Sequence, residues 1–310
     1  MNNSLKIGII SGLIAGIVAS LVNISFYAPL IFKLGLPYYY IPQPPETPFI
    51  KIAITEITIT FIWGIILGII YSKIHDMIPG KGVFKGLIFG LAYYLIYSIR
   101  IAIFHVAYGS MLEAASALLL IAPIVYGLVL GILYKAPKEK LKIKKHEILS
   151  GVIPGAITGF IFGTAVIISF VISTYFGVIL GFLEIFPDYL ADFEFIIYQF
   201  MNHGWINMLW YAVFGAIYAE FYYRIPGRSI IKGAIFGLII WLITSFRISL
   251  YWLAYGSLSW AFQWGLLPDL YIFVGILLEG VYRRQPRAII ISGIVYAIVI
   301  IRTILLGLLS

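Results

Sequence analysis

The chain has 310 residues, of which 62% are hydrophobic and 11% are charged, and its formal net charge is +8. A soluble domain carries about 25% charged residues, and a disordered chain contains far fewer apolar residues than this one. Both classes are therefore excluded, and the composition predicts an all-α polytopic membrane protein. The chain has no cysteine, which also excludes disulfides, cysteine-ligated zinc and thiol catalysis.

Nine segments are apolar and long enough to cross a bilayer, because roughly 20 helical residues span its hydrocarbon core. In chain order they are 7–27, 52–72, 84–106, 112–134, 148–172, 201–222, 231–253, 260–282 and 288–309. The apolar stretch 173–186 continues beyond the fifth segment. We expect it either to lengthen that helix or to lie along the membrane interface.

Basic residues indicate which side of the membrane each loop faces. Sixteen of the 21 Lys and Arg precede the first segment or lie in alternate loops after it. The positive-inside rule places those loops in the cytoplasm. We therefore expect a multi-pass protein of the cell membrane, with the N-terminus in the cytoplasm and the C-terminus outside. Residues 1–27 are read as a retained helix rather than a cleaved signal peptide, because the apolar run is long and has a counterpart in the second half of the chain.

The two halves of the chain resemble each other. Residues 78–110 and 225–257 are identical at 18 of 33 positions, at an offset of 147. This duplication predicts two four-helix repeats and a ninth helix, with the boundaries 1–134, 135–147 (a basic cytoplasmic linker), 148–283 and 284–310. Since four is an even number, the repeats are expected to be parallel, and their ancestor to have been a homodimer of the four-helix unit.

Glycines four residues apart recur in six of the nine segments. The pairs are Gly12/Gly16, Gly64/Gly68, Gly86/Gly90, Gly127/Gly131 and Gly233/Gly237, with a longer series at Gly151, Gly155, Gly159 and Gly163. At that spacing the glycines share a helix face and allow close approach of a neighbouring backbone. Tight helix packing is the expected consequence, and a glycine-lined binding groove is the alternative.

Five charged residues lie within the predicted spans and away from their ends, where a charge is costly unless it is paired or hydrated. Arg100, Arg247 and Arg302 each follow a basic residue at the inner end of their segment by 15 positions, which places them roughly 22 Å from the inner edge. Glu56 and Asp269 lie at similar depth. We expect the pairs Glu56–Arg100 and Asp269–Arg247. These charges either fix the helix register or form a site that binds an anionic group or relays protons.

Two histidines are further candidates for a site. His105 and His203 lie near outer helix ends, and they would suit a bis-histidine haem only if they face each other at one depth. Nothing else in the sequence supports haem, so no cofactor and no metal is expected.

Sequence motifs of common nucleotide-binding proteins and hydrolases are absent. The chain contains no phosphate-binding loop, no H-E-x-x-H and no G-x-S-x-G, so no catalytic residue is assigned. The six-lysine linker reads as a topology signal that contacts anionic lipids, and not as a nucleic-acid site.

The four-helix unit resembles a known kind of protein. It has G-x-x-x-G-x-x-Y in its second helix (Gly64, Gly68, Tyr71) and G-x-x-x-G at the start of its third (Gly86, Gly90). With these motifs it resembles uncharacterised four-helix integral membrane proteins of archaea, here duplicated in tandem. The motifs cover about half of each repeat, and the resemblance implies no function and no site residue.

Three functions are compatible with the sequence. The first is a transporter or channel for a small solute or ion, with a polar site in the outer half of the bundle. The second is a non-catalytic accessory subunit of a larger membrane complex, with other membrane subunits as partners. The third is an intramembrane lipid-modifying enzyme, which no recognisable group of residues supports. The sequence favours the first.

Overall fold

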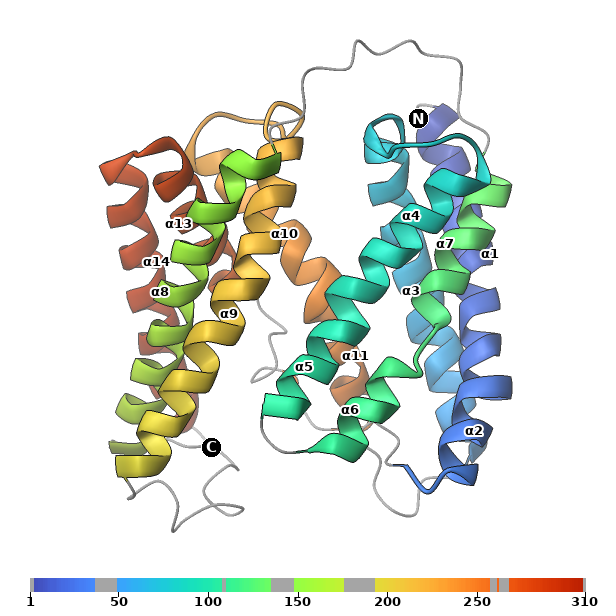
Figure 1. The fold of residues 1–310 in the computed structure, drawn as a ribbon, viewed down its shortest axis with the longest axis horizontal. Helices are drawn as coiled ribbons and strands as arrows, with labels where there is room; N and C mark the ends of the chain where they lie inside the picture. Colours follow the sequence, from blue (N-terminus) through green and yellow to red (C-terminus); the bar gives the residue numbers. More distant parts are fainter. Residues whose placement is uncertain are drawn as a thin grey trace. The chain divides into compact units, whose positions relative to one another are not determined.

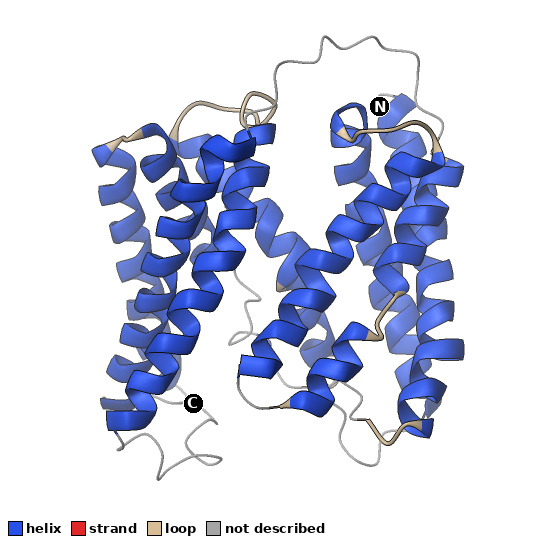
Figure 2. Ribbon diagram, viewed as in Figure 1, coloured by secondary structure: helices blue, strands red, loops and turns tan. Residues whose placement is uncertain are grey.

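The computed structural model of the chain describes residues 3–36, 49–107, 110–134, 148–175, 193–256, 261 and 268–308. Within these ranges every regular element is a helix (Figure 2). The chain divides into two compact units. The first contains residues 1–144 and 242–264, and the second contains residues 145–241 and 265–310.

Several helices have the length and composition of membrane spans. Four of them are continuous enough to be counted singly: Asn3–Lys33, Ala53–Met77, Val83–Ile103 and Met111–Leu133. A fifth candidate consists of two helices that meet at a bend of 46° near Ser245. These apolar helices fit a multi-pass membrane protein.

The first unit is a bundle whose main helices lie side by side in Figure 1. Its elements are α1 (Asn3–Val22), η1 (Asn23–Tyr27), α2 (Ala28–Lys33), α3 (Phe49–Ile74), η2 (His75–Met77), α4 (Val83–Tyr94), η3 (Leu95–Ile99), α5 (Arg100–Ala107), α6 (Met111–Leu118), α7 (Ala122–Leu133) and α11 (Phe246–Ala254). Helix α1 packs against α3 and α7, α4 packs against α7, and α11 packs against α3.

Glycines lie where these helices cross. A Cβ atom added to Gly12 would be 2.2 Å from the carbonyl oxygen of Gly64, and one added to Gly86 would be 2.3 Å from that of Gly127. Such distances are far below van der Waals contact. The α1–α3 and α4–α7 crossings therefore depend on glycine at these positions.

Three of the four spans counted singly contain an irregular stretch, and the bent fifth candidate contains a break. Residues Asn23–Tyr27 and Leu95–Ile99 form π-helical turns inside longer helices. The helical hydrogen bonding breaks between α6 and α7, around Leu120, where Pro123 follows in the first turn of α7. The fourth interruption is the bend near Ser245. Helix α3, in contrast, runs without a break.

The break between α6 and α7 leaves backbone carbonyls that the α-helical ladder does not satisfy. The Ser98 hydroxyl donates to the Leu120 carbonyl over 3.2 Å, and the Tyr94 hydroxyl donates to the Leu118 carbonyl over 2.5 Å. Side chains of the neighbouring helix thus replace the missing backbone hydrogen bonds, as a break at membrane depth requires.

The second unit is also a helical bundle. Its elements are α8 (Ile148–Tyr175), α9 (Phe193–Phe221), most of α10 (Ile230–Thr244), α13 (Asp269–Arg283) and α14 (Pro286–Leu308). The last three residues of α10 belong to the first unit, because the division falls after Trp241. Helix α8 packs against α9 and α13, and α13 packs against α14. The α8–α9 crossing is close, because a Cβ atom added to Gly151 would be 1.8 Å from the Gly215 carbonyl oxygen.

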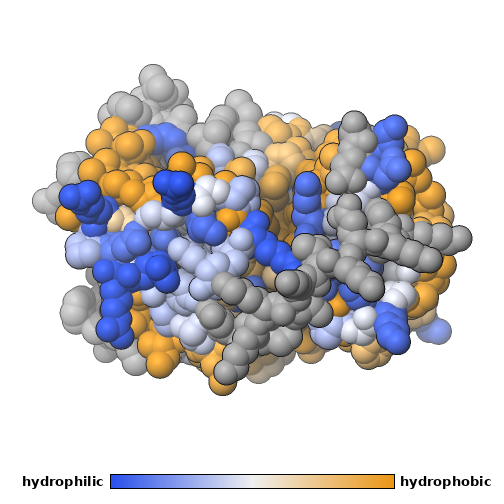
Figure 3. Space-filling model, turned by 90° about the horizontal axis from the view of Figure 1, so that it is seen from above, coloured by the Kyte–Doolittle hydropathy of each residue, from blue (hydrophilic) through white to orange (hydrophobic). Residues whose placement is uncertain are grey.

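The surface of the helices is apolar along their length and polar at their ends. Large hydrophobic side chains are exposed on many helices, for example Ile10, Phe61, Leu209 and Ile298. Seen from above, hydrophilic side chains gather on this end of the helices and hydrophobic ones lie around them (Figure 3). This distribution is the one expected of helices that face lipid.

The described helices differ in places from the predicted spans. The first predicted segment, 7–27, continues as a helix to Lys33. Within the predicted segment 260–282 the structure describes residue 261 and then, from 268 on, the helix α13, which begins at Asp269. The linker 135–147 and most of the stretch 173–186 lie outside the described residues.

Candidate functional site

Among the described residues of the first unit, α3 carries a fully buried carboxylate. Glu56 has no exposed surface. Its Oε1 atom accepts hydrogen bonds from Asn23 Nδ2 at 2.8 Å and from Thr60 Oγ1 at 3.1 Å. Its Oε2 atom accepts a hydrogen bond from the Tyr251 hydroxyl. Asn23 comes from η1 and Tyr251 from α11, so three segments meet at this carboxylate.

Arg247 supplies the opposite charge. Its Nη2 atom lies 3.2 Å from Glu56 Oε1, and only 3% of the residue is exposed. The same nitrogen donates to Thr60 Oγ1 at 3.1 Å and to the Tyr251 hydroxyl at 3.2 Å, and Nη1 donates to the Tyr93 hydroxyl at 3.3 Å. The guanidinium is thus held by an anion and three hydroxyl groups, as a buried cation requires.

Aromatic rings surround this ion pair. The guanidinium carbon of Arg247 lies 5.9 Å from the centroid of the Tyr97 ring and 5.7 Å from that of Tyr251. The indole nitrogen of Trp63 donates to the Tyr93 hydroxyl at 2.7 Å. Cation–π contacts stabilise a desolvated guanidinium. We call Asn23, Glu56, Thr60, Tyr93, Arg247 and Tyr251 the buried polar cluster.

The interruptions in the helices lie next to the buried polar cluster. Asn23 is the first residue of η1, and Tyr93 lies two positions before η3. Ala122 starts α7 after the break, and Arg247 is the second residue of α11 after the bend. Non-helical backbone at membrane depth is tolerated only where it is buried in protein or lines a cavity. The continuous helix α3 therefore carries the carboxylate, and four interrupted spans surround it.

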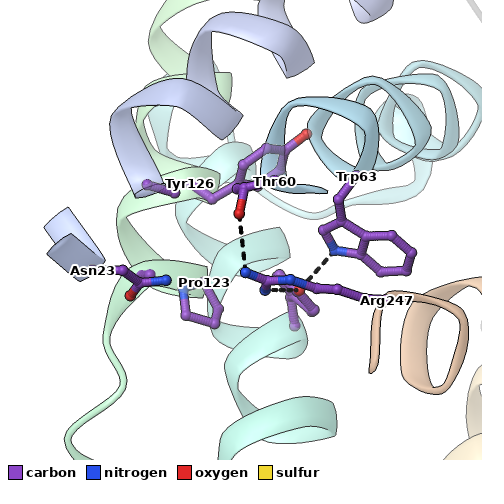
Figure 4. A pocket seen from close by; sticks show the side chains of 9 residues that line it. Asn23, Thr60, Trp63, Pro123, Tyr126 and Arg247 are labelled. Atoms are coloured by element: carbon purple, nitrogen blue, oxygen red, sulfur yellow. Dashed lines mark hydrogen bonds between the residues drawn. The ribbon is translucent and has the colours of Figure 1, made fainter. Parts of the chain in front are cut away.

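A small cavity adjoins the cluster. Its volume is about 10 Å³, which is close to the minimum for one water molecule. It is lined by Ala19, Asn23, Thr60, Trp63, Tyr93, Ala122, Pro123, Tyr126 and Arg247. Figure 4 shows the Arg247 guanidinium at this cavity, with its hydrogen bond to Thr60 drawn as a dashed line. At this volume the cavity has room for about one water molecule beside Arg247.

Both expected ion pairs were wrong. Glu56 pairs with Arg247 and not with Arg100. Asp269 pairs with Arg302 and not with Arg247. The physical reason is that matching depths along helices does not determine which helix lies beside which. Residues 242–264 pack in the first unit, which brings Arg247 to Glu56. Asp269 begins α13, which packs against α14, and α14 carries Arg302.

The remaining candidates have different positions. Arg100 begins α5 and is partly exposed. His105 lies one turn further along α5 and is also partly exposed. Arg302 is in α14, with 27% of its side chain exposed in its pair with Asp269. The side chain of His203 lies outside the described residues. Of the seven predicted site residues, the buried polar cluster contains Glu56 and Arg247.

Sequence reasoning missed the uncharged members of the cluster. Asn23, Thr60, Tyr93 and Tyr251 are not ionised, so a search for charges in spans does not find them. Two signals were available in the sequence. Thr60 lies four residues after Glu56, and Tyr251 lies four residues after Arg247, which places each beside its charged neighbour on a helix face.

The second unit buries a carboxylate of its own. Glu279 has no exposed surface, and it accepts hydrogen bonds from the hydroxyls of Tyr218 at 2.6 Å and Tyr222 at 3.4 Å. At an offset of 148 its counterpart in the first half is Gly131. The counterpart of Tyr218 is Tyr71, whose buried hydroxyl has no hydrogen-bond partner among the described residues.

This difference predicts unequal effects of two equivalent substitutions. We expect Tyr218→Phe to destabilise the protein by about 1.5–3 kcal/mol, the range for a hydrogen bond to a charged group. Tyr71→Phe should be neutral or stabilising, because it removes a buried hydroxyl without a partner. Thermal unfolding of both purified variants in one detergent would measure this. Equal losses of stability in the two variants would contradict it.

The described residues contain no group of three or more His, Cys, Asp or Glu that could hold a metal ion. Comparison with known proteins found no matching family model, no matching curated protein and no matching solved structure. The buried polar cluster therefore has to be interpreted from its own chemistry.

Proposed function

We propose that this protein is a transporter for a small solute or ion, with the buried polar cluster as its polar site. One observation carries this proposal: four interrupted spans converge on an ion pair that is removed from solvent. Transporters bind their cargo near discontinuous helices, whose free backbone groups and helix ends face the site. Single-turn π-helical segments within α-helices are likewise frequent at functional sites.

The cost of the ion pair supports the same proposal. Helix packing alone does not need a carboxylate and a guanidinium, since apolar residues of similar volume are often as stable or more stable at such positions. A function that uses the two charges gives a reason for their presence in spans of this hydropathy. The small cavity then belongs to a closed state, and cargo enters after α11 and α3 have moved relative to each other.

The architecture we propose for this transporter is the one expected from the sequence. It has nine spans, built as two parallel four-helix repeats and a C-terminal helix, with a cytoplasmic N-terminus and an external C-terminus. The identity between residues 78–110 and 225–257 supports the duplication. A shared contact supports it too: Lys85 and Lys232, which are equivalent by sequence, each donate to the carbonyl of the residue ten positions earlier.

A flux assay tests the transport proposal. The purified protein is reconstituted in liposomes, and the movement of neutral polyols, monovalent cations and monovalent anions is followed separately. We expect protein-dependent flux of one class, reduced at least tenfold by the double variant Arg100→Met/Arg247→Met. The single variants Arg100→Met and Arg247→Met show which of the two arginines is responsible for the reduced flux.

Glu279→Gln serves as the control for flux, because it changes a buried carboxylate outside the cluster. Each variant is used only if it elutes as a monodisperse peak in detergent. Protein-dependent flux that survives the double arginine change would place the site elsewhere, and no flux in any class would refute the transport proposal.

A second candidate is an accessory subunit of a membrane complex. The small volume of the cavity beside the buried polar cluster favours it, since a cavity of about 10 Å³ suits a structural ion pair. In that case partners co-purify in fixed ratio after gentle solubilisation. A protein that purifies without partners and transports a solute would exclude this candidate.

A further inference from the structure

Glu56 occupies a shell that is built for an oxyanion. The shell offers the Asn23 amide, the Thr60 hydroxyl, the Tyr251 hydroxyl and the Arg247 guanidinium, and all four donate hydrogen bonds to the carboxylate. Guanidinium groups recognise carboxylates and other planar oxyanions through parallel N–H···O bonds. The structure therefore shows four donors around one oxyanion position, and a side chain of the protein itself occupies that position.

Charge balance determines what can replace this occupant. Glu56 and Arg247 are 0% and 3% exposed, and a charge left alone at such a position is strongly disfavoured. The guanidinium does not lose its proton in proteins. Glu56 can thus leave the shell only as the neutral acid, and Arg247 then needs another anion.

We propose that the cargo is a small monovalent oxyanion, which takes the place of Glu56 beside Arg247 when Glu56 binds a proton. This inference rests on the proposed transport function and names its substrate class. Hydronium gives one proton to the Glu56 carboxylate, where an O–H bond forms, and is left as water, while one oxyanion forms the new ion pair with Arg247. The site remains neutral in both states, so one proton and one anion move together.

The small cavity offers a position beside the cluster for a water molecule that could carry the proton. Asn23 Oδ1 has no hydrogen-bond partner among the described residues, and the residue is 1% exposed and lines the cavity. The Tyr93 hydroxyl lines it too and accepts bonds from both Trp63 and Arg247, which leaves its own hydrogen to be donated. One water molecule fits this volume and would find an acceptor and a donor there.

The surroundings of Glu56 favour a proton over a metal cation as the coupled ion. An alkali or alkaline-earth cation needs several oxygen ligands at once, whereas both carboxylate oxygens of Glu56 already accept hydrogen bonds and a guanidinium lies 3.2 Å away. The charged or titratable groups facing Glu56 are Arg247 and Tyr251 from α11, Tyr255 directly after α11, and Tyr93 from α4.

The test uses nitrate as the probe, because it is a planar monovalent oxyanion. Proteoliposomes containing the full chain and a trapped pH indicator are given an inward nitrate gradient, and the membrane potential is clamped with potassium and valinomycin. We expect internal acidification in a 1:1 ratio to nitrate uptake, at a rate independent of the clamped potential. Liposomes without protein provide the background.

Three variants separate the roles of the two charges. Glu56→Gln should move nitrate without protons, so that its flux becomes dependent on potential. Arg247→Met should lower nitrate flux at least tenfold. Arg247→Lys keeps the charge but loses the planar guanidinium, and it should retain the 1:1 ratio at a reduced rate. Glu279→Gln, the control, should behave as the unchanged protein.

Two results would overturn the oxyanion proposal. One is nitrate uptake without acidification in the unchanged protein, and the other is proton coupling that persists in Glu56→Gln. If instead a cation or a neutral polyol moves and nitrate does not, the transport proposal stands and the oxyanion proposal fails. If no class of solute moves, both fail.

Discussion

Arg247→Met is expected to destabilise the protein by about 3–5 kcal/mol, because it leaves the Glu56 carboxylate buried without a cation. The double variant Glu56→Gln/Arg247→Met should recover most of the lost free energy of unfolding. In it, a neutral amide replaces the carboxylate, and Asn23, Thr60 and Tyr251 still have hydrogen-bond partners. Reversible unfolding in mixed detergent micelles, with all variants measured in parallel, would give the free energies of unfolding and the coupling between the two sites.

The Asp269–Arg302 pair provides a matched comparison. It is also an Arg–carboxylate pair, but about a quarter of each side chain is exposed, so solvent can compensate for a lost partner. Arg302→Met should therefore cost on the order of 1 kcal/mol. If Arg302→Met and Arg247→Met lower the free energy of unfolding equally, burial does not determine how much the Glu56–Arg247 pair contributes to stability.

Gly86→Val is the second change with a large expected effect. The Cβ atom of a side chain at position 86 would by itself lie 2.3 Å from the Gly127 carbonyl oxygen and 2.4 Å from the Gly131 Cα. These are backbone atoms that cannot rotate away. Helices α4 and α7 must separate, which also displaces Tyr93 and Tyr126 at the cavity. We expect a loss of at least about 3 kcal/mol, at the upper end for overpacking.

Gly293→Ala is the control for this glycine crossing. Gly293 lies in α14, and nothing lies within 4 Å of an added Cβ atom. Alanine is preferred over glycine in a helix by about 1 kcal/mol, so this variant should be as stable as the unchanged protein or more so. Fluorescence-detected size exclusion after heating would compare both variants. An unchanged thermal stability of Gly86→Val would contradict the α4–α7 crossing.

The class of the protein follows from its sequence, while the arrangement of its helices does not. Long apolar runs predict membrane helices because few other structures tolerate them, and the first four predicted spans correspond to helices of the first unit. The π-helical turn at Asn23 and the break near Leu120 were not predicted. Both depend on neighbouring side chains, such as Ser98, that compensate for lost backbone bonds.

Of the six residues of the buried polar cluster, the sequence analysis named Glu56 and Arg247, and it paired each of them with another residue. Glu56 and Arg247 were visible because charges are rare in these spans. Their contact was not, because residue counting gives the depth of a side chain and not its direction around the helix or its neighbours. The similarity between the two halves of the sequence was misleading here. It relates Arg247 to Arg100 and thereby favoured pairs within each half, whereas Arg247 pairs with Glu56 from the first half of the chain.

The contribution of residues 242–264 to the first unit has a consequence for synthesis of the protein. A ribosome adds about 5–20 residues per second, so roughly 5–20 seconds separate the emergence of Lys144 from that of Arg247. During this interval Glu56 is in the membrane without its cation. The polar contacts of Glu56 in the first bundle are therefore expected to be completed only after α11 has been synthesised and has docked.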